Sequence, residues 1–382
     1  MQFKLNLVAA AALVAFAGST HAQEIVKIGH VAPTSGGTAH LGKDNENGAR
    51  MAIDELNAKG VVIGGKKVKF ELLAEDDGAD PKQGTAAAQK LVDSKVNGVV
   101  GHLNSGTSIP ASKIYSDAGI PQISPSATNT RYTLQGFKTT FRVVANDGQI
   151  GNTLGKYAVQ QLKGQSIAII DDRTAYGQGV ADEFGKGVVA AGSKTVGREF
   201  TNDKATDFTA ILTNLKAKKP DIIFFGGMDA VAGPMLRQMK QLGITAKLMG
   251  GDGICSTELP KLAAGSMADG QVVCAEAGGI DDKDVVATKA MADFKARYKA
   301  KFNADVQIYS PYVYDAVNLM AAAMQKAGSA DPVKYLPELA KTSTYKGVTG
   351  LISFDEKGDI KNGALTLHTY MAGKQTNIGV VR

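Results

Sequence analysis

Short apolar runs alternate with helical stretches along most of this chain, and this alternation constrains the fold more than any other feature. The runs are rich in branched residues and nearly continuously apolar, as in residues 167–170. Strands buried on both faces have this composition, because helices cover both faces of a parallel sheet. We therefore predict an α/β fold with parallel sheets. The expected strands are 25–31, 68–74, 96–101, 122–124, 166–171, 195–200, 221–226, 247–250 and 271–275.

Amphipathic stretches lie between these strands. In the first of them, Ala49, Ala52, Ile53 and Leu56 recur at three- and four-residue steps, which indicates the core-facing stripe of a helix. Gly60 follows directly and is typical of a helix end. The expected helices are 42–58, 81–93, 147–162, 178–191, 207–218 and 230–242, followed in the tail by 284–301, 312–327 and 332–341.

The alternation restarts in the middle of the chain. One set of strands runs from 25 to 123, a β-like segment follows at 139–144, and a second set runs from 167 to 273. The chain has 382 residues, more than the ~250–300 that a single core organises, so we expect two α/β lobes. Short strands at 351–354 and 365–371 are expected to be shared between the lobes. Short extended crossings between the lobes would form a hinge.

The first 22 residues have the features of a secretory signal peptide. Lys4 supplies a positive charge, residues 5–17 are apolar apart from Asn6, and small residues precede the polar Gln23. The apolar run is shorter than the ~20 residues that span a bilayer. We expect residues 1–22 to be cleaved and the mature protein to be soluble and periplasmic. No cysteine stands at the cleavage site, so a lipid anchor is not expected.

Charge and composition disfavour nucleic acid as a partner. Loss of Lys4 lowers the formal net charge from +6 to +5, and the basic side chains are dispersed rather than clustered. The chain also has no Trp. Surfaces that bind nucleic acid carry clustered Lys and Arg, so we expect no such partner.

The chain has two cysteines, Cys255 and Cys274. In an oxidising compartment we expect them to form one disulfide, and the alternative is two buried free thiols. No metal site is predicted, because the five histidines show no ligand spacing and two cysteines do not complete a tetrahedral zinc site. No cofactor is expected either, since residues 251–256 miss the dinucleotide fingerprint, with Ser in its last position.

Two hydroxyl-rich loops, at residues 101–108 and 124–130, each follow an apolar run and precede an expected helix. In an α/β sheet such loops meet in one crevice at the carboxyl ends of the strands. Unpaired N–H groups at a helix start, together with uncharged hydroxyl donors, hold a small anion well. We predict that Ser105, Ser126 and Thr128 bind a carboxylate. The alternative is that they are ordinary helix N-caps.

A cluster of acidic residues at 75–77 and Asp80 allows a metal or catalytic interpretation. Asp80 precedes Pro81, and Pro is common at the first position of a helix. We therefore favour a structural role for Asp80 as a helix start.

Five segments together resemble the leucine/isoleucine/valine-binding proteins of bacterial ABC importers. They are residues 34–60, residues 73–83, the two hydroxyl-rich loops, residues 171–179 with Tyr176 and Gly177, and residues 354–358. The resemblance implies the type I periplasmic-binding-protein fold, with two doubly wound parallel-sheet lobes joined by three crossovers. It places the N-terminal lobe at 24–143 plus 276–360 and the C-terminal lobe at 144–275 plus 361–382.

The same resemblance assigns roles in the first lobe. Ser105 matches the serine whose hydroxyl and backbone N–H hold the carboxylate of the ligand. Ser126, Ala127 and Thr128 match the second loop, where the carbonyl of residue 126 accepts from the ligand ammonium and Thr128 serves both charges.

In the second lobe, Tyr176 matches a tyrosine that closes over the ligand, and Asp252 stands where the family usually has a glutamate for the ammonium. Leu41 and Met228 replace tyrosines of relatives that bind branched-chain amino acids, so the side-chain pocket is expected to be altered and broader in range. The alternatives are a packed core tyrosine at 176 and a helix N-cap at Asp252.

These observations favour a non-catalytic receptor that binds an aliphatic L-amino acid and delivers it, as a monomer, to the membrane permease of an ABC importer with its cytoplasmic ATPases. One alternative is a receptor of the same fold for 4-aminobutyrate, a small amide or an aromatic acid. Another is an exported amide hydrolase with Ser105 as nucleophile and only His102 nearby as a base. A third is the sensory domain of a signalling protein, against which no transmembrane or output segment follows Arg382.

Overall fold

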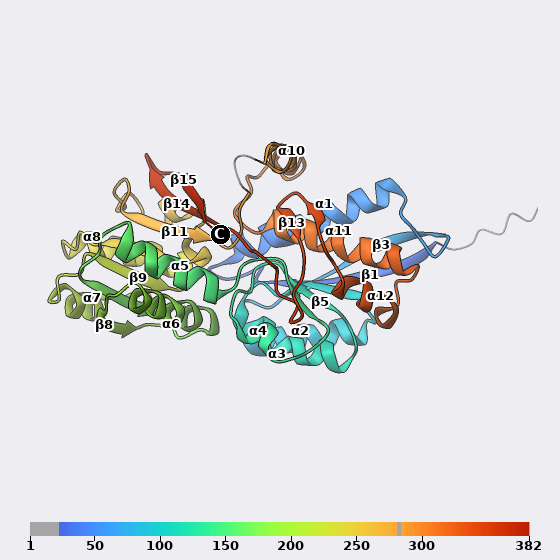
Figure 1. Ribbon diagram of the computed structural model, residues 1–382, viewed down its shortest axis with the longest axis horizontal. Coiled ribbons are helices and arrows are strands. Elements are labelled where there is room, and N and C mark those ends of the chain that lie inside the picture. The colour runs from blue at the N-terminus through green and yellow to red at the C-terminus, as the bar shows by residue number, and fades with distance from the viewer. Residues whose placement is uncertain (1–22, 281–283, 382) are drawn as a thin grey trace, which may run out of the picture.

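The structure, a computed structural model, describes residues 23–280 and 284–381, and these form two α/β lobes side by side (Figure 1). The expected signal peptide lies outside the described residues. None of the described helices is long and apolar enough to cross a membrane.

The first lobe is built on a six-stranded sheet with the order β2-β3-β1-β4-β5-β6. Its neighbours pair in parallel except for the short β2, which is antiparallel to β3. The strands are β1 (Glu24–Ala32), β2 (Val62–Ile63), β3 (Lys66–Asp76), β4 (Gly98–Gly101), β5 (Gln122–Ser124) and β6 (Thr140–Arg142). The helices of this lobe are α1 (Ala39–Lys59), α2 (Pro81–Asp93), α3 (Ser105–Asp117), α4 (Arg131–Leu134), α10 (Val285–Phe302), α11 (Ser310–Ala327) and α12 (Pro332–Ala340).

The second lobe is built on a seven-stranded sheet with the order β15-β14-β11-β10-β9-β7-β8. The strands are β7 (Ile167–Asp171), β8 (Thr195–Phe200), β9 (Ile222–Gly226), β10 (Lys247–Gly250), β11 (Val272–Glu276), β14 (Leu365–Met371) and β15 (Lys374–Val381). Its helical elements are α5 (Asp147–Gln160), α6 (Ala175–Ala190), α7 (Thr209–Lys216), α8 (Asp229–Gln241), the 3₁₀ turn η1 (Asp252–Ile254) and α9 (Leu259–Leu262).

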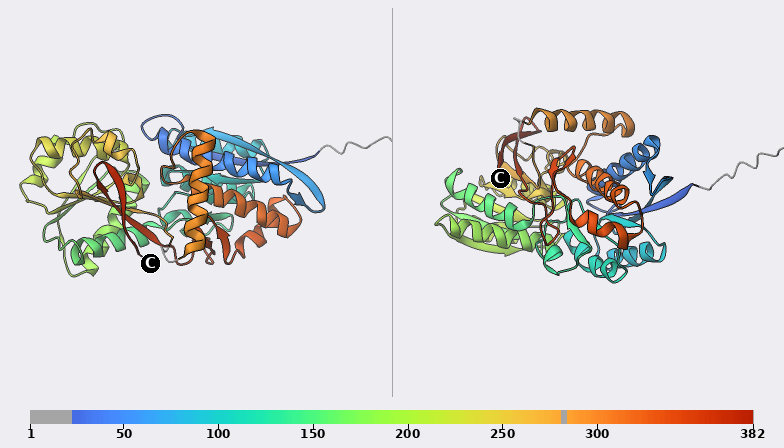
Figure 2. Two further views of the ribbon diagram at one scale, coloured as in Figure 1. Left: turned by 90° about the horizontal axis from the view of Figure 1, so that it is seen from above. Right: turned by 45° about the vertical axis from the view of Figure 1, so that its right-hand side comes forward.

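The chain passes between the lobes at three places. It leaves the first lobe between β6 and α5 and returns between β11 and α10. It leaves again after the small hairpin of β12 (Tyr345–Gly347) and β13 (Gly350–Ile352) to form β14. Both views in Figure 2 show the late red strands lying with the green and yellow lobe, while the orange helices lie with the blue one. The exact lobe boundaries stay a prediction.

Side-chain caps fix where several helices begin. Asp80 accepts hydrogen bonds from the backbone N–H groups of Lys82 and Gln83, and Pro81 follows it at the first helical position. The structural role expected for Asp80 is therefore confirmed. Asn146 forms a reciprocal capping box with Gln149 at the start of α5.

The second sheet differs from the expectation of purely parallel strands, because β14 and β15 are added to its edge in antiparallel orientation. The sequence did not predict β15, since most of its residues are exposed or half-buried and it lacks the apolar run of a central strand. The helix expected after the loop at 124–130 is only the single turn α4.

The structure joins Cys255 and Cys274 in a disulfide, with their Cα atoms 5.4 Å apart. Cys255 follows η1 and Cys274 lies in β11, and both are fully buried. The bond ties the segment that carries Asp252 to the sheet of the second lobe.

We expect the double variant Cys255→Ala, Cys274→Ala to have a free energy of unfolding lower by about 3 kcal/mol. The reason is that a closed loop of 19 residues gains freedom in the unfolded chain. Denaturant titration measures the change, and the reduced wild type should unfold at the same midpoint as the double variant. Equal unfolding midpoints for the oxidised wild type and the variant would show that the disulfide is absent or does not stabilise the protein.

Candidate functional site

A small cavity lies between the two lobes, with an empty volume of about 200 Å³. It is lined by residues of both lobes, which are Leu103, Asn104, Ser105, Ser126 and Tyr309 on the first-lobe side and Tyr176, Met228 and Asp252 on the second-lobe side. Five of the eight predicted ligand residues are among them. The other three, Leu41, Ala127 and Thr128, are buried but do not line the cavity.

On the first-lobe side, hydrogen bonds hold the two hydroxyl-rich loops together. Ser105 is the first residue of α3, and its Oγ accepts a hydrogen bond from the backbone N–H of Asn129 at 3.2 Å. Ser126 Oγ donates to the carbonyl of Leu103 at 3.1 Å. Neither side chain caps a helix, because the residue before α3 is Asn104 and α4 begins after Thr130. The two loops therefore form one wall of the cavity, with the N-terminus of α3 behind it.

Behind this wall lie buried oxygen atoms for which the described residues provide no hydrogen-bond partner. The hydroxyl of Thr128 and both carboxyl oxygens of Asp147 are buried without a hydrogen bond. Burial is the main cause that raises the pKa of Asp147 well above its usual range; the neighbouring Thr128 hydroxyl opposes the shift, and the negative charge of Asp252 adds to it.

On the second-lobe side, Asp252 begins η1 and is 1% exposed. Its Oδ1 accepts a hydrogen bond from the hydroxyl of Tyr176 at 3.0 Å, and its Oδ2 accepts one from the hydroxyl of Tyr309 at 2.7 Å. Burial raises its pKa to about 6, while the two tyrosine hydrogen bonds oppose the shift. The carboxylate therefore bonds to Tyr176 of its own lobe and to Tyr309 across the cavity, and it does not act as a helix cap.

Two glycines explain why Asp252 can approach Tyr176 so closely. A Cβ atom at Gly251 would lie 2.7 Å from the Tyr176 hydroxyl oxygen, and one at Gly253 would lie 2.7 Å from the Tyr176 ring. The backbone N–H of Gly253 also donates to the Tyr176 hydroxyl at 2.9 Å. The Gly-Asp-Gly sequence therefore makes room for an aromatic side chain, which differs from the phosphate contact of a dinucleotide site.

Tyr309 is a residue that sequence reasoning missed. It is held by Asp44 on α1, whose buried carboxylate accepts the backbone N–H groups of residues 307–310 at 2.8 to 3.2 Å. A carboxylate that collects several N–H groups fixes the backbone strongly. The signal in the sequence was Asp44 itself, a charged residue on the otherwise buried stripe of α1.

Comparisons with known proteins show the family of this chain. The sequence profile of the periplasmic binding protein family matches residues 25–373. The chain belongs to the periplasmic binding protein family. It is 38% identical to the Leu/Ile/Val-binding protein homolog 1 of Brucella abortus, over 96% of this chain and 95% of the relative. It is 36% identical to the leucine-, isoleucine-, valine-, threonine- and alanine-binding protein of Pseudomonas aeruginosa, over 96% and 95% of the two chains.

Solved structures of the family have the same fold. The substrate-binding protein LivJ of Streptococcus pneumoniae, solved in complex with isoleucine, superimposes with a TM-score of 0.81 at 29% identity, over 94% of this chain and 99% of that chain. The type I fold and the family resemblance expected from the sequence are thereby confirmed.

A fully buried arginine supports the second loop of this periplasmic binding protein. Arg142 donates from Nη1 to the carbonyl oxygens of Ala127 and Asn129 at 3.0 and 2.9 Å. Its Nε and Nη2 donate to Oδ1 of Asp359, at 2.9 and 2.5 Å. Asp359 lies just before the third crossover, so one ion pair connects the loop wall to the hinge region. Sequence reasoning missed both residues, because the pair joins positions 217 residues apart.

The histidine next to the first loop is engaged elsewhere. His102 is fully buried, with Nδ1 3.2 Å from Oδ2 of Asp77 and Nε2 3.0 Å from the hydroxyl of Tyr115. Both ring nitrogens are therefore occupied, and Ser105 Oγ accepts from a backbone N–H instead of facing the imidazole.

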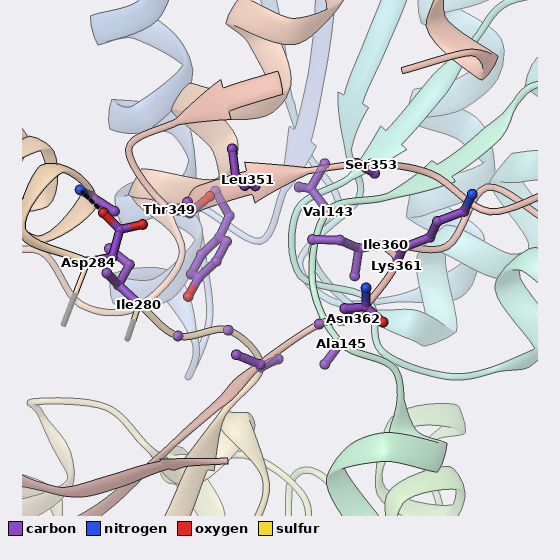
Figure 3. Close-up of a pocket in the computed structure, with 18 of the residues that line it drawn as sticks. Val143, Ala145, Ile280, Asp284, Thr349, Leu351, Ser353, Ile360, Lys361 and Asn362 are labelled. Atoms are coloured by element: carbon purple, nitrogen blue, oxygen red, sulfur yellow. Dashed lines mark hydrogen bonds between the residues drawn. The ribbon is translucent and has the colours of Figure 1, made fainter. Parts of the chain in front are cut away.

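A wider cavity, with an empty volume of about 1170 Å³, lies at the crossovers (Figure 3). Val143 and Ala145 of the first crossover line it together with Ile360 and Asn362 of the third. None of the predicted ligand residues lines this cavity. This cavity is larger than the one between the lobes, but Ser105 and Asp252, the polar groups that face each other from the two lobes, line the smaller cavity.

Proposed function

We propose that this periplasmic binding protein is a receptor that binds an aliphatic, branched-chain type L-amino acid between its lobes. The observation that carries the proposal is the opposition of two kinds of group across the cavity. Uncharged hydroxyl and N–H groups at Ser105 and Ser126 form one wall, and the carboxylate of Asp252 forms the other. A dipolar amino acid requires anion donors at one end and an acidic acceptor at the other. Charge-assisted hydrogen bonds of this kind strengthen when water is excluded.

We assign the carboxylate of the ligand to Ser105 and Thr128, and its ammonium to Asp252, Thr128 and the carbonyl of Ser126, with Ala127 as part of the same loop. The buried hydroxyl of Thr128 supports its assignment, because it has no partner in the protein. Tyr176 orients Asp252 within the second lobe by its hydrogen bond, and Tyr309 bonds to the same carboxylate from the first lobe.

The relatives support an aliphatic ligand. The Pseudomonas aeruginosa protein is named for leucine, isoleucine, valine, threonine and alanine, and the Streptococcus pneumoniae protein was solved with isoleucine. In this chain the side-chain end of the pocket includes Met228, whose flexible thioether fits ligands of different shape. Leu41, in the first turn of α1, is fully buried but does not line the cavity, so we propose only an indirect role for it behind the pocket.

The remaining candidates differ in what they need at Asp252. 4-Aminobutyrate would use the carboxylate, whereas an uncharged amide or an aromatic acid would not. An amide hydrolase needs a base at Ser105, and the nearby His102 is bonded to Asp77 and Tyr115. We therefore propose that the protein is not an enzyme.

We further propose that the protein acts in the periplasm as a monomer, after removal of its signal peptide. The closed form would dock on the permease of an ABC importer, which its cytoplasmic ATPases drive. Ligand binding then signals through the lobes, because the ligand contacts both of them only in the closed form.

A thermal-shift screen tests the proposed ligand class. The purified mature protein is heated with each of the twenty amino acids, 4-aminobutyrate and benzoate. A ligand present at 100 times its Kd stabilises the native state by about 2.7 kcal/mol, so leucine, isoleucine or valine should raise the melting temperature clearly. A shift with benzoate and none with any amino acid would reject the amino-acid receptor.

Ser105→Ala should weaken leucine binding by roughly tenfold or more, because a hydrogen bond to a charged ligand group contributes about 1.5–3 kcal/mol. Isothermal titration calorimetry measures the change. Ser116→Ala, on the same helix but outside the cavity, is the matched control and should bind like the wild type. Equal affinities for the two variants would remove Ser105 from the site.

A further inference from the structure

A histidine and an aspartate meet across the cleft outside the ligand cavity. His40 lies in the first turn of α1 in the first lobe, and Asp229 is the first residue of α8 in the second lobe. His40 Nε2 is 2.7 Å from Oδ2 of Asp229. Ser256, which follows η1, donates its hydroxyl to the same oxygen. Neither His40 nor Asp229 lines the cavity, so the pair has no direct contact with a bound ligand.

The pair can exist only when the lobes are together. The helix α1 packs on α11, β3 and β1 of the first lobe, whereas α8 packs on α9 and η1 of the second. Other polar contacts between the lobes include Tyr309 to Asp252, Asn129 to the carbonyl of Ala175, Thr257 to Gln307 and Tyr312 to Glu276. Among the groups in these contacts, His40 is a histidine, whose charge changes near neutral pH, and it lies outside the cavity.

The two partners are largely shielded from water, so loss of one of them would leave the other without this hydrogen bond. Asp229 is fully buried and the His40 side chain is 24% exposed. The second carboxyl oxygen of Asp229 has no hydrogen bond, so the carboxylate depends on His40 and Ser256 for its satisfaction. A hydrogen bond between an imidazolium and a carboxylate is stronger than one between neutral groups.

We propose that His40 and Asp229 form a latch that stabilises the closed form, sets the balance between open and closed protein, and thereby sets ligand affinity. They are positioning residues: they act on the ligand through the lobes. Asp229 follows Met228 directly, and Met228 lines the cavity, so the latch lies next to the second-lobe wall of the pocket. The inference rests on the proposed function, because it concerns the affinity of the same cleft.

The charges around His40 determine whether the closed form is favoured at low or at high pH. Burial lowers the pKa of His40, but the hydrogen bond and charge of Asp229, with smaller contributions from Glu258 and from Asp44 on α1, raise it above 6.5 in the closed form. In the open form His40 loses Asp229, and its pKa returns toward the ordinary value of about 6.5. Protons therefore bind the closed form more tightly. The stabilisation of the closed form by the latch is complete when the pH is below the open-form pKa of His40. It is lost as the pH rises through the closed-form pKa of His40.

The test measures the Kd for L-leucine by isothermal titration calorimetry between pH 6.5 and 8.5. In the wild type, affinity should fall as the pH rises, by up to about tenfold for each unit by which closure raises the pKa of His40. His40→Gln should bind several-fold more weakly at pH 6.5 and show a flat profile. Asp229→Asn should behave in the same way, and the double variant should be no weaker than either single variant. A wild-type affinity and pH profile in His40→Gln would overturn the latch.

A matched control is available within one lobe. His368 on β14 faces Glu276 on β11, with Nε2 3.3 Å from Oε2, and both strands belong to the second sheet. Separation of the lobes does not break the contact of His368 with Glu276, because both residues lie in the second sheet; Oε1 of Glu276 separately accepts from the hydroxyl of Tyr312 in the first lobe at 2.8 Å. His368→Gln should therefore keep the affinity and pH profile of the wild type.

A second measurement separates failure of the latch from failure of the receptor. Small-angle X-ray scattering of the ligand-free protein reports how far the lobes are apart. The wild type should be more compact at pH 6.5 than at pH 8.5, and His40→Gln should be expanded at both. If leucine does not bind any variant but this difference appears, the latch stands and the proposed ligand is wrong. Identical scattering for the wild type and His40→Gln at both pH values would reject the latch whether or not leucine binds.

Discussion

Asp252→Asn is expected to weaken the binding of L-leucine by about 100-fold or more while leaving the fold intact. A buried charge that loses its partner costs about 2–5 kcal/mol, and in this variant the ligand ammonium is the charge left without one. The amide has the same shape as the carboxylate and can still bond with the hydroxyls of Tyr176 and Tyr309, so the walls of the cavity should keep their places.

Calorimetry with leucine measures the loss, and thermal denaturation checks that the variant is folded. Asp182→Asn is the matched control, since Asp182 is a half-exposed residue on α6 that pairs with Arg198 at the surface of the same lobe. It should bind leucine like the wild type. If Asp252→Asn keeps wild-type affinity, the ammonium of the ligand does not meet this carboxylate.

The pH dependence of binding provides a second arm of this prediction. Burial raises the pKa of Asp252 to about 6 in the ligand-free protein, and only the ionised carboxylate attracts an ammonium. Affinity should therefore fall as the pH drops below about 6, by up to about tenfold per pH unit. The fall should be missing in Asp252→Asn. Together with the His40 latch, it predicts an optimum for leucine binding between the two pKa values.

Arg142→Met is expected to lower the free energy of unfolding by about 3–5 kcal/mol. Removing one partner of a buried ion pair leaves the other charge without compensation, and Asp359 is only 13% exposed. The carbonyl oxygens of Ala127 and Asn129 would also lose their donor, so the second loop should loosen and leucine affinity should fall with stability.

Denaturant titration of the ligand-free protein measures this change. The double variant Arg142→Met, Asp359→Asn should recover part of the loss, because it removes both charges. Lys113→Met, which breaks an exposed pair with Asp117, is the control and should change stability by less than about 1 kcal/mol. An unfolding midpoint for Arg142→Met equal to that of Lys113→Met would mean that the buried pair does not support the fold.

The sequence predicted most strands of the two sheets, including the half-buried edge strand β8. The strands at Gln122–Ser124, Thr195–Phe200, Lys247–Gly250 and Leu365–Met371 were predicted with the bounds that they have in the structure. The edge strand β15 was missed, because an edge strand that is mostly exposed needs no continuous apolar run. The antiparallel pairing of β14 was also missed, since pairing direction depends on the path of the chain through the third crossover.

The candidate site could be located only in part for a related reason. Loops that follow parallel strands have local signatures, so the loops around Ser105 and Ser126 were visible in the sequence. Tyr309, Arg142 and the pair of His40 with Asp229 act through partners far away in the chain, with separations of 57, 217 and 189 residues. No local pattern marks such contacts. Only the fold brings these residues to the cleft.

A crystal structure of the protein with L-leucine tests the central claim most directly. We predict leucine between the lobes, with its α-amino nitrogen within hydrogen-bond distance of the Asp252 carboxylate and its carboxylate against Ser105 and Thr128. Leucine in the crossover cavity of Figure 3, or in the cleft with its amine turned away from Asp252, would contradict the account.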